Sequence, residues 1–434
     1  MKKILFLAPK MNGPKGDFIY NETWPEALNT KIDRARWRIV TPALLLLASI
    51  AAEEEFDVQI ADEDFTEPST DTFFDIVSIY TVTPNFKRAC WYAKMFKASG
   101  AWVVMGGVHA TLLPEDCKNH CDTVLIGEGE EIFRRFLRDF KNNAARTVYT
   151  QKKSVVDLTK TAVPYYQALR REEQRLVPLQ TARGCSHSCQ FCNVKSLYGS
   201  YFRCKTRTQV VEELHEIDKL PHAKNIYVTD DNIYSDIRHF LALTEALGRF
   251  HFTWYANTDI SFGDDEGHIK RAYQSGLRQV LIGLEGISES GLRGIDADNF
   301  KYRYLKRYKE NLCRIQSNGI GVVGSFIVGR EDDTEDVFPR LAEFIYDTSL
   351  YGASITVFTP YPGTALFHKM KIRERIMTYD WDYYTIFQPV IKMNYMTMDR
   401  LNELYRKLIF TVYSDAFVHR RVQFFSDVYK RMGR

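Results

Sequence analysis

Two series of apolar segments alternate with amphipathic stretches along the chain. The first series reads KKILFLAP, FDVQIADED, DIVSIYTVTP, AWVVMGGVHATLLPED and DTVLIGEGEE, with helical stretches at about 42–54, 86–99 and 131–141. Alternating strands and helices predict a parallel, doubly wound sheet that binds ligands at the carboxyl ends of its strands. Only EDFTEPSTDTFF separates the strand ending near Asp62 from the one starting near Asp75, which is too short for a crossover helix.

The second series predicts a barrel. Its strands read LVPLQTAR, NIYVTDDN, FTWYANTDI, QVLIGLEG, GVVGSFIVGRED and SITVFTPYPGT, with helices such as RTQVVEELHEIDKL between them. Six such units are two short of a complete eightfold barrel, so we expect a partial (β/α)6 barrel that is open on one side. The predicted organisation is a sheet domain over 1–145, a polar linker over 146–178, the barrel over 179–370 and a helical C-terminal region over 371–434.

Composition and charge narrow the function. The chain has 434 residues and a net charge of +3 from 58 basic and 55 acidic side chains, so nothing indicates a nucleic-acid partner. The longest apolar stretch, VTPALLLLASIAA, is too short to span a bilayer, and MKKILFLAPK reads as a first strand rather than a signal peptide. Eight cysteines do not make a disulfide scaffold, so we expect a reducing, cytoplasmic location without a transmembrane segment.

Three cysteines lie close together in RGCSHSCQFC, residues 183–192, with C-x3-C-x2-C spacing: Cys185, Cys189 and Cys192. A structural zinc site usually has four protein ligands, and the other five cysteines form no second C-x2-C half-site. An iron–sulfur cube held by three cysteines leaves one iron free to bind a substrate or cofactor. The motif follows the first barrel strand, where barrel enzymes place their chemistry. A structural zinc and unrelated buried thiols remain the alternatives.

The same motif resembles the signature of the radical S-adenosylmethionine (radical SAM) superfamily. YVTDDNIYSD, VLIGLEGISES, GSFIVGRED and FTPYPGTALF resemble strand-end motifs of the subgroup that carries an N-terminal, Rossmann-like, cobalamin-binding domain. PALLLLASIAAEEEFDVQIADED and GGVHATLLPE resemble that domain, and the closing DWDYYTIFQPVIKMNYMTMDRLNELYRKL resembles the subgroup's tail. The resemblance implies a [4Fe-4S] cluster on Cys185, Cys189 and Cys192, SAM on the fourth iron, a 5′-deoxyadenosyl radical, and a reductant such as flavodoxin or ferredoxin.

Further residues are candidates for the SAM side of the site. Asp230 and Asp231 end a strand, where carboxylates could accept hydrogen bonds from SAM, although one of them could be a solvated turn residue. Glu285 closes the apolar strand VLIGL, and a buried charge needs a partner that a polar group of SAM would supply. The remaining candidates, each with packing or a turn as its alternative, are Phe191, Gly324, Ser325, Thr359 and Tyr361.

Cobalamin is predicted at the carboxyl ends of the N-terminal strands. The candidate contacts are Thr81, Thr83, Gly106, Gly107 and Gly127. The pattern D-x-H-x-x-G is absent, which argues against a protein imidazole on the cobalt. We interpret His109 as a structural hydrogen-bonding residue and Cys117 and Cys121 as core residues. The short stretch at 63–74 leaves open a rudimentary domain that is retained for its fold alone.

Three functions follow as hypotheses. The first is a cobalamin-dependent C-methyltransferase, in which one SAM methylates cob(I)alamin, a second yields the radical, and an unactivated carbon receives the methyl group. The second is a non-methylating radical cyclase, dehydratase, rearrangement or C–C coupling enzyme. The third, a non-enzymatic iron–sulfur or zinc sensor, fits the barrel motifs poorly. The 28 Phe and 25 Tyr suit a lipid, tetrapyrrole or natural-product substrate, but the sequence specifies neither the substrate nor the oligomeric state.

Overall fold

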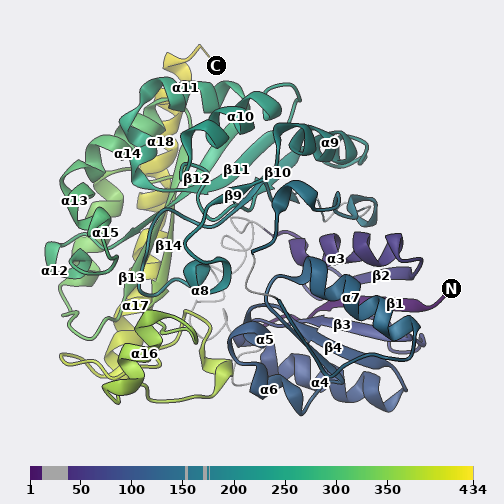
Figure 1. Ribbon diagram of the computed structural model, residues 1–434. Coiled ribbons are helices and arrows are strands. Elements are labelled where there is room, and N and C mark those ends of the chain that lie inside the picture. The colour runs from purple at the N-terminus through teal and green to yellow at the C-terminus, as the bar shows by residue number, and fades with distance from the viewer. Residues whose placement is uncertain (12–37, 152–154, 170–173, 175, 434) are drawn as a thin grey trace.

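A parallel six-stranded sheet forms the N-terminal part of the chain (Figure 1). The computed structural model describes residues 1–434 except 12–37, 152–154, 170–173, 175 and 434. The strand order is β2-β1-β3-β4-β5-β6. All neighbouring strands are parallel, which confirms the predicted doubly wound sheet. The strands are β1 (Lys3–Ala8), β2 (Asp57–Asp62), β3 (Ile76–Tyr80), β4 (Trp102–Gly106), β5 (Thr123–Ile126) and β6 (Val148–Thr150).

Helices cover both faces of this sheet. On one face, Ala48 and Phe133 belong to the same apolar cluster as Phe6 of the sheet. On the other face, Ala89 and Phe96 pack against Val103 and its neighbours. The helices are α3 (Pro42–Glu53), α4 (Phe86–Ala98), α5 (Val108–Leu112), α6 (Pro114–Lys118) and α7 (Gly129–Lys141), close to the predicted ranges where a prediction was made.

The connection from β2 to β3 runs over residues 63–75 without a helix, as its length predicts. It passes β1, because β1 lies between β2 and β3 in the sheet. In such a sheet the strand order reverses at β1 and β3, and the carboxyl ends at that point border a crevice where ligands bind. Strand β6 was not predicted and lies within 146–178, where a linker was expected, because three residues are too few for a periodic pattern.

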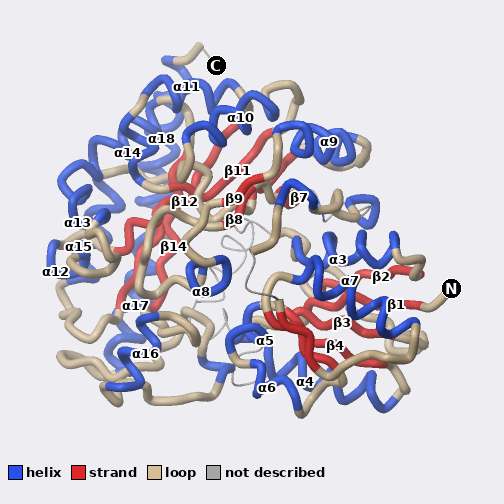
Figure 2. Tube along the Cα trace, viewed as in Figure 1, coloured by secondary structure: helices blue, strands red, loops and turns tan. Residues whose placement is uncertain are grey.

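The second parallel sheet has the order β14-β13-β12-β11-β10-β7. Its six strands curve into a barrel wall whose edge strands β14 and β7 do not pair with each other, which agrees with the predicted partial barrel (Figure 2). The strands are β7 (Leu176–Leu179), β10 (Asn225–Val228), β11 (Thr253–Thr258), β12 (Leu277–Glu285), β13 (Gly321–Val328) and β14 (Gly352–Val357). A short antiparallel pair, β8 (Ala182–Arg183) and β9 (Arg203–Cys204), lies beside it.

Alternation along these strands separates an outer face from an inner one. In β11, Trp254 and Ala256 are buried with the residues of the covering helices, whereas Tyr255 and Asn257, which alternate with them, are only half-buried. The half-buried set faces the barrel interior, where Tyr227 donates a hydrogen bond of 2.8 Å to Asn257. The helices are α8 (Val194–Tyr198), α9 (Arg207–Asp218), α10 (Ile237–Leu247), α11 (Glu266–Gln274), α12 (Glu289–Leu292), α13 (Phe300–Tyr304), α14 (Tyr308–Ser317) and α15 (Val337–Asp347).

The C-terminal region returns to both sheets. Tyr405 donates a hydrogen bond of 2.8 Å to the carbonyl of Ile355 in the barrel. Trp381 donates one of 2.9 Å to Asp116, and Lys87 lies 2.6 Å from Asp380, so the segment around Trp381 also contacts the N-terminal sheet. The elements are α16 (Ala365–Ile372), the 3-10 helix η7 (Trp381–Tyr383), α17 (Met398–Val412) and α18 (Asp415–Arg431).

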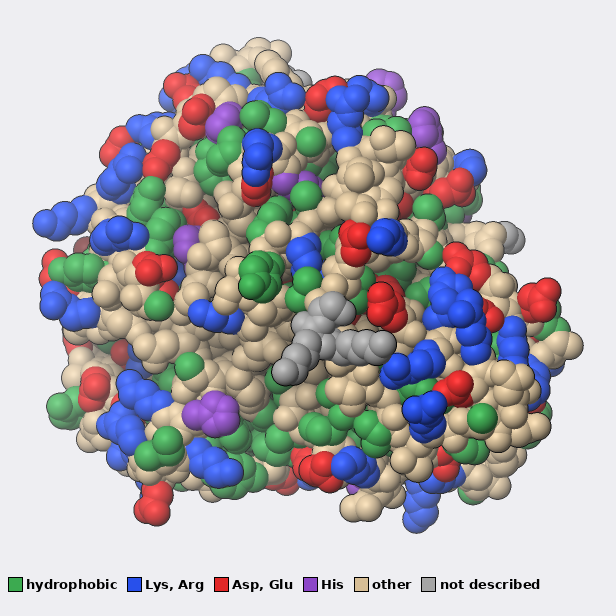
Figure 3. Space-filling view, in the orientation of Figure 1, with side chains coloured by type: hydrophobic (Ala, Val, Ile, Leu, Met, Phe, Trp, Pro, Cys, Tyr) green, Lys and Arg blue, Asp and Glu red, His purple; other side chains and the backbone are tan. Residues whose placement is uncertain are grey.

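The surface and the helices set limits on partners. Acidic and basic side chains are interspersed over the face shown in Figure 3, in line with the small net charge of +3. None of the helices in the described part of the chain is long and apolar enough to cross a bilayer.

Candidate functional site

The three cysteines of the motif lie in one loop, residues 184–193, which we call the cluster loop. It follows β8 and ends where α8 begins, at the carboxyl end of the barrel strands. Burial raises the pKa values of Cys189 and Cys192, and a neighbouring thiol adds to each shift, Cys192 to that of Cys189 and Cys185 to that of Cys192, so the three thiols lie near one another. The loop therefore brings together the residues that the sequence predicted as cluster ligands.

Two aspartates fix the backbone that leads into the cluster loop. Asp230 accepts hydrogen bonds from the amides of Thr181, at 2.6 Å, and Ala182, at 2.8 Å. Asp231 accepts one of 2.8 Å from the amide of Gly184. Gly184 has a φ of +97°, and a Cβ there would lie 2.4 Å from the carbonyl oxygen of Tyr201, so only glycine fits this turn. Both predicted aspartates thus lie at the site, where their contacts hold the loop.

A polar network that the sequence did not reveal lies beside Cys185. His187 and Asn232 both hydrogen-bond Asp259, at 2.9 and 2.7 Å, and the Asn232 amide lies 3.9 Å from the Cys185 sulfur. These three residues come from the cluster loop and from the turns after β10 and β11. Neither His187 within the motif nor Asp259 at a strand end was singled out, because no spacing rule relates them.

Glu285 ends β12 and has an internal partner. Its carboxylate lies 3.1 Å from the ammonium of Lys301, and both side chains are 7% exposed. Lys301 also donates a hydrogen bond of 2.5 Å to the carbonyl of Gly283. The backbone of Glu285 has a φ of +62°, a strained conformation for a residue with a side chain. The sequence predicted a polar group of SAM as the partner of this buried charge, and the structure shows that Lys301 of the same chain is one partner. A role of Glu285 toward SAM stays a prediction.

The segment that carries Lys301 is joined to the cluster loop. Asp296 forms an antiparallel bridge with Cys189, and Gln190 donates a hydrogen bond of 2.9 Å to Ile295. Burial by itself lowers the pKa of Lys301, but the Glu285 carboxylate outweighs this effect and raises it. Lys301 therefore stays a cation in the part of the barrel that holds Cys189.

The cysteine environment fits an iron–sulfur cluster. Burial raises the pKa of Cys189 to about 12 and that of Cys192 to about 11. All three cysteines are half-buried. Across the described residues, no group of three or more His, Cys, Asp or Glu is close enough together to hold one metal ion. An iron–sulfur cube does not require the three sulfurs to meet at one metal ion, because each of its cysteines binds a different iron.

The other SAM-side candidates have mixed surroundings. Phe191 packs against an apolar cluster of the C-terminal region that contains Phe358 and Tyr384. A Cβ at Gly324 would meet Leu350 and Phe326, whereas Ser325 belongs to the half-buried set on the inner side of the wall. The hydroxyl groups of Thr359 and Tyr361 donate to the carbonyls of Val357 and Tyr384. Roles of these residues toward SAM stay predictions.

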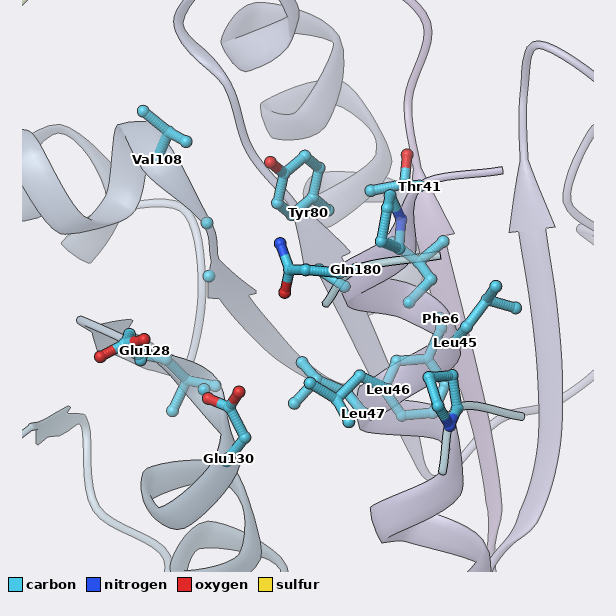
Figure 4. Close-up of a pocket in the computed structure, with 18 of the residues that line it drawn as sticks. Phe6, Thr41, Leu45, Leu46, Leu47, Tyr80, Val108, Glu128, Glu130 and Gln180 are labelled. Atoms are coloured by element: carbon cyan, nitrogen blue, oxygen red, sulfur yellow. The ribbon is translucent and has the colours of Figure 1, made fainter. Parts of the chain in front are cut away.

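A cavity lies between the N-terminal sheet and the barrel, and we call it the inter-sheet cavity (Figure 4). Gly106, Gly107 and Gly127 line it, at the carboxyl ends of β4 and β5. The barrel contributes Gln180, Arg183, Leu197, Tyr198 and Lys205, none of which was predicted. Helix α3 adds apolar side chains, including Leu46 and Leu47 in Figure 4.

Thr81 and Thr83, the other two predicted cobalamin contacts, do not line this cavity. Thr81 is fully buried and donates a hydrogen bond of 2.9 Å to the carbonyl of Gly106. Thr83 is 2% exposed and lies 3.5 Å from His109. The hydroxyls of both threonines bond residues around the β4–α5 turn, since Thr81 also accepts a hydrogen bond from the amide of Ala110. His109 is buried there too and stacks on Phe86, and no histidine lines the cavity among the described residues.

Comparisons with known proteins agree with this geometry. Residues 179–345 match the model of the radical SAM superfamily. This part of the chain is a radical SAM domain. The matched residues include the cluster loop and the four barrel strands β10 to β13, so a [4Fe-4S] cluster and SAM are the cofactors, with Cys185, Cys189 and Cys192 as the residues that fit the cluster.

Several known proteins are similar to most of this chain. A bacteriochlorophyllide d C-12(1)-methyltransferase of Chlorobaculum tepidum is 27% identical over 88% of this chain and 84% of its own. An anaerobic magnesium-protoporphyrin IX monomethyl ester cyclase of Rubrivivax gelatinosus is 22% identical over 80% of this chain and 68% of its own. The structure of the cobalamin-dependent SAM radical enzyme OxsB, with aqua-cobalamin and SAM bound, has a TM-score of 0.68 at 14% identity, and covers 93% of this chain and 66% of OxsB.

We predict that replacing Cys185, Cys189 or Cys192 by Ala abolishes the cluster, because a cube held by three thiolates cannot spare one. Anaerobically reconstituted protein should bind about four irons and absorb in the visible range. Cys117→Ala and Cys313→Ala, outside the cluster loop, should retain both signals. Zinc in stoichiometric amount without iron–sulfur absorption would contradict the assignment.

We predict that Glu285 and Lys301 are strongly coupled in stability. Lys301→Met leaves a buried carboxylate without its partner and should cost about 3–5 kcal/mol in the free energy of unfolding, measured with urea. Adding Glu285→Gln to Lys301→Met should recover most of this loss, because neither side chain is then charged. If the two single effects simply add in the double variant, the pair is not an energetic unit.

We predict a pH-dependent contribution from His239, whose ring nitrogen lies 2.9 Å from the Thr181 hydroxyl. Burial by itself lowers the pKa of His239, but hydrogen bonds to Asp230 and Cys204 outweigh it and raise it to about 9. A His whose pKa is raised in the folded state stabilises the fold, and this contribution is fully present below the ordinary pKa near 6.5. It is lost as the pH rises through about 9. Relative to His239→Gln, the wild type should lose about 1–3 kcal/mol of unfolding free energy between pH 6.5 and 9.5.

The control for this measurement is His251→Gln, because His251 is exposed. Its difference from the wild type should stay constant over the same pH range. A constant difference for His239→Gln as well would show that its imidazole carries no extra proton in the folded state.

Proposed function

We propose that this radical SAM enzyme is a cobalamin-dependent C-methyltransferase. The observation that carries the proposal is the inter-sheet cavity, which lies at the carboxyl ends of β3, β4 and β5 and is bounded on its far side by residues that flank the cluster loop. When bound, the cluster with SAM supplies a 5′-deoxyadenosyl radical, and cobalamin supplies a methyl group. The cavity would place cobalamin next to the cluster and SAM.

The residues around the cavity suit a large cofactor with a flat ring. Gly107 has a φ of +106°, and a Cβ there would lie 2.7 Å from the carbonyl oxygen of Thr81, so glycine allows the close backbone approach. Leu44 to Leu47 supply an apolar wall, whereas Tyr80, Thr111 and Gln180 supply polar groups. With no histidine in the described lining, the cobalt would be bound without a protein imidazole.

On the barrel side, the chain's own residues would orient SAM and shield the radical. We assign Glu285 to the SAM ammonium, because it is the acidic residue that ends β12 near Cys189 and Cys192. Asp231 retains an oxygen beyond the one that holds Gly184, and we assign that oxygen to a polar group of SAM. Ser325 on the inner wall would contact the adenosine part. A small electron-transfer protein such as flavodoxin or ferredoxin would reduce the cluster.

For the substrate we propose an apolar small molecule, such as a tetrapyrrole, a lipid or another natural product. The related methyltransferase of Chlorobaculum tepidum acts on a bacteriochlorophyllide, which supports a tetrapyrrole. The second candidate function is a non-methylating radical cyclase, and the relative of that name in Rubrivivax gelatinosus favours it. We propose a cytoplasmic location for either activity.

We predict that Gly106→Leu removes cobalamin but not the cluster. A Cβ at Gly106 meets only Leu125, at 3.6 Å, so the fold should tolerate the substitution while the larger side chain occupies the cavity edge. Protein reconstituted with hydroxocobalamin and freed of excess ligand should show at least tenfold less bound cobalamin by absorption, with unchanged iron.

Gly267→Leu is the matched control, because Gly267 is exposed on α11 of the barrel. It should retain cobalamin like the wild type. Full retention by Gly106→Leu would place cobalamin elsewhere. If the wild type retains none and still converts SAM to 5′-deoxyadenosine, the methyltransferase assignment fails and the non-methylating enzyme replaces it.

A further inference from the structure

Three buried charged side chains and one half-buried arginine join the cluster loop to the wall of the inter-sheet cavity, and we call them the charge seam: Glu128, Glu130, Arg183 and Arg203. Arg183 contacts Glu128 at 2.7 Å and Glu130 at 2.6 Å. Arg203 contacts both oxygens of Glu128, at 3.0 and 3.1 Å. The arginine side chains are 9% and 12% exposed, and the glutamates 4% and 10%. Exposed ion pairs contribute little, but a buried pair is costly to break.

The charge seam contacts the chain on both sides of the cluster loop. Arg183 stands two residues before Cys185, and Tyr198 stands six residues after Cys192. The ring of Tyr198 lies 5.8 Å from the Arg183 guanidinium and 5.9 Å from that of Arg203. A displacement of the guanidinium groups would therefore shift the chain both before Cys185 and after Cys192.

The same seam forms part of the cavity wall. Gly127, Glu128, Gly129 and Glu130 all line the cavity, and α7 begins at Gly129. Figure 4 shows the carboxylates of Glu128 and Glu130 together on one side, with Leu46 and Leu47 of α3 on the other. The amide of Glu128 donates a hydrogen bond of 2.8 Å to Gln151, so its backbone is fixed as well. A ligand that presses on this wall acts directly on the carboxylates that hold Arg183.

We propose that Arg183 is a positioning residue that couples occupancy of the inter-sheet cavity to the geometry of the cluster loop. This proposal rests on the proposed function, since it takes cobalamin as the ligand of the cavity. The planar guanidinium binds Glu128 through one nitrogen and Glu130 through another, whereas a lysine offers a single ammonium. Two sites that share such a link bind their ligands cooperatively, and the effect is reciprocal.

The test compares the affinity of the full-length protein for hydroxocobalamin with and without its iron–sulfur cluster. The wild type should bind hydroxocobalamin about fivefold or more tightly when the cluster is present, because coupled sites typically differ by 5- to 150-fold. In Arg183→Lys the ratio should fall toward one while the iron content stays at the wild-type level. A residue that merely stabilised the fold would change both affinities equally and leave the ratio unaltered.

Arg207→Lys is the matched control, because Arg207 pairs with Glu245 on the exposed surface at 2.5 Å. It should keep the wild-type ratio. Glu130→Gln is the second variant if Arg183→Lys does not fold, and its ratio should also fall. Cobalamin binding with a ratio of one in the wild type, or with an unchanged ratio in both seam variants, overturns the coupling alone. No binding by the wild type under either condition overturns the proposed function and the coupling together.

Discussion

The hydrogen bonds from the chain entering the cluster loop to Asp230 and Asp231 are the constraint on which the site depends. Three thiolates can hold one cluster only if the loop between them keeps its shape. A loop has no regular backbone hydrogen bonds of its own that would fix this shape. Here the amides of Thr181, Ala182 and Gly184 are anchored on carboxylates that end a neighbouring barrel strand. Such charge-assisted bonds are shorter and stronger than neutral ones. The barrel therefore transmits its rigidity to the cysteines.

Buried charge of both signs surrounds this anchor. Lys301 neutralises Glu285 near the cluster loop, and the two glutamates of the charge seam neutralise Arg183. Each pair joins segments that are distant in sequence. Buried ion pairs add little net stability over apolar packing, but they admit only one arrangement, since a shifted register would leave a charge unpaired. Their contribution is thus to hold β12, the segment at 295–301 and the start of α7 in defined places around the cofactors.

The two sheets need more than the seam to stay together. The C-terminal region closes the arrangement from the opposite side, where Trp381 bonds Asp116 and Lys87 pairs with Asp380. The same region packs Tyr384 and Phe358 beside Phe191 of the cluster loop. A single chain thus encloses the inter-sheet cavity between an N-terminal sheet and a barrel, and these two contacts, together with apolar packing of Val40 and Leu45 in the barrel core, set their relative position.

The sequence by itself determined five strands of the N-terminal sheet, the six barrel strands and the three cysteines, because each is visible in a local pattern. A strand is visible in its apolar run, and C-x3-C-x2-C is a spacing within eight residues. It also indicated Gly106, Gly107 and Gly127, since strand ends of a doubly wound sheet meet at one edge. Only the tertiary structure decided which side chains face which way. Thr81 and Thr83 bond Gly106 and His109 and do not line the cavity, Glu285 pairs with Lys301, and Arg183 reaches Glu128 and Glu130. These contacts join residues 16 to 55 positions apart, and no local pattern encodes which charged residue a buried charge will meet.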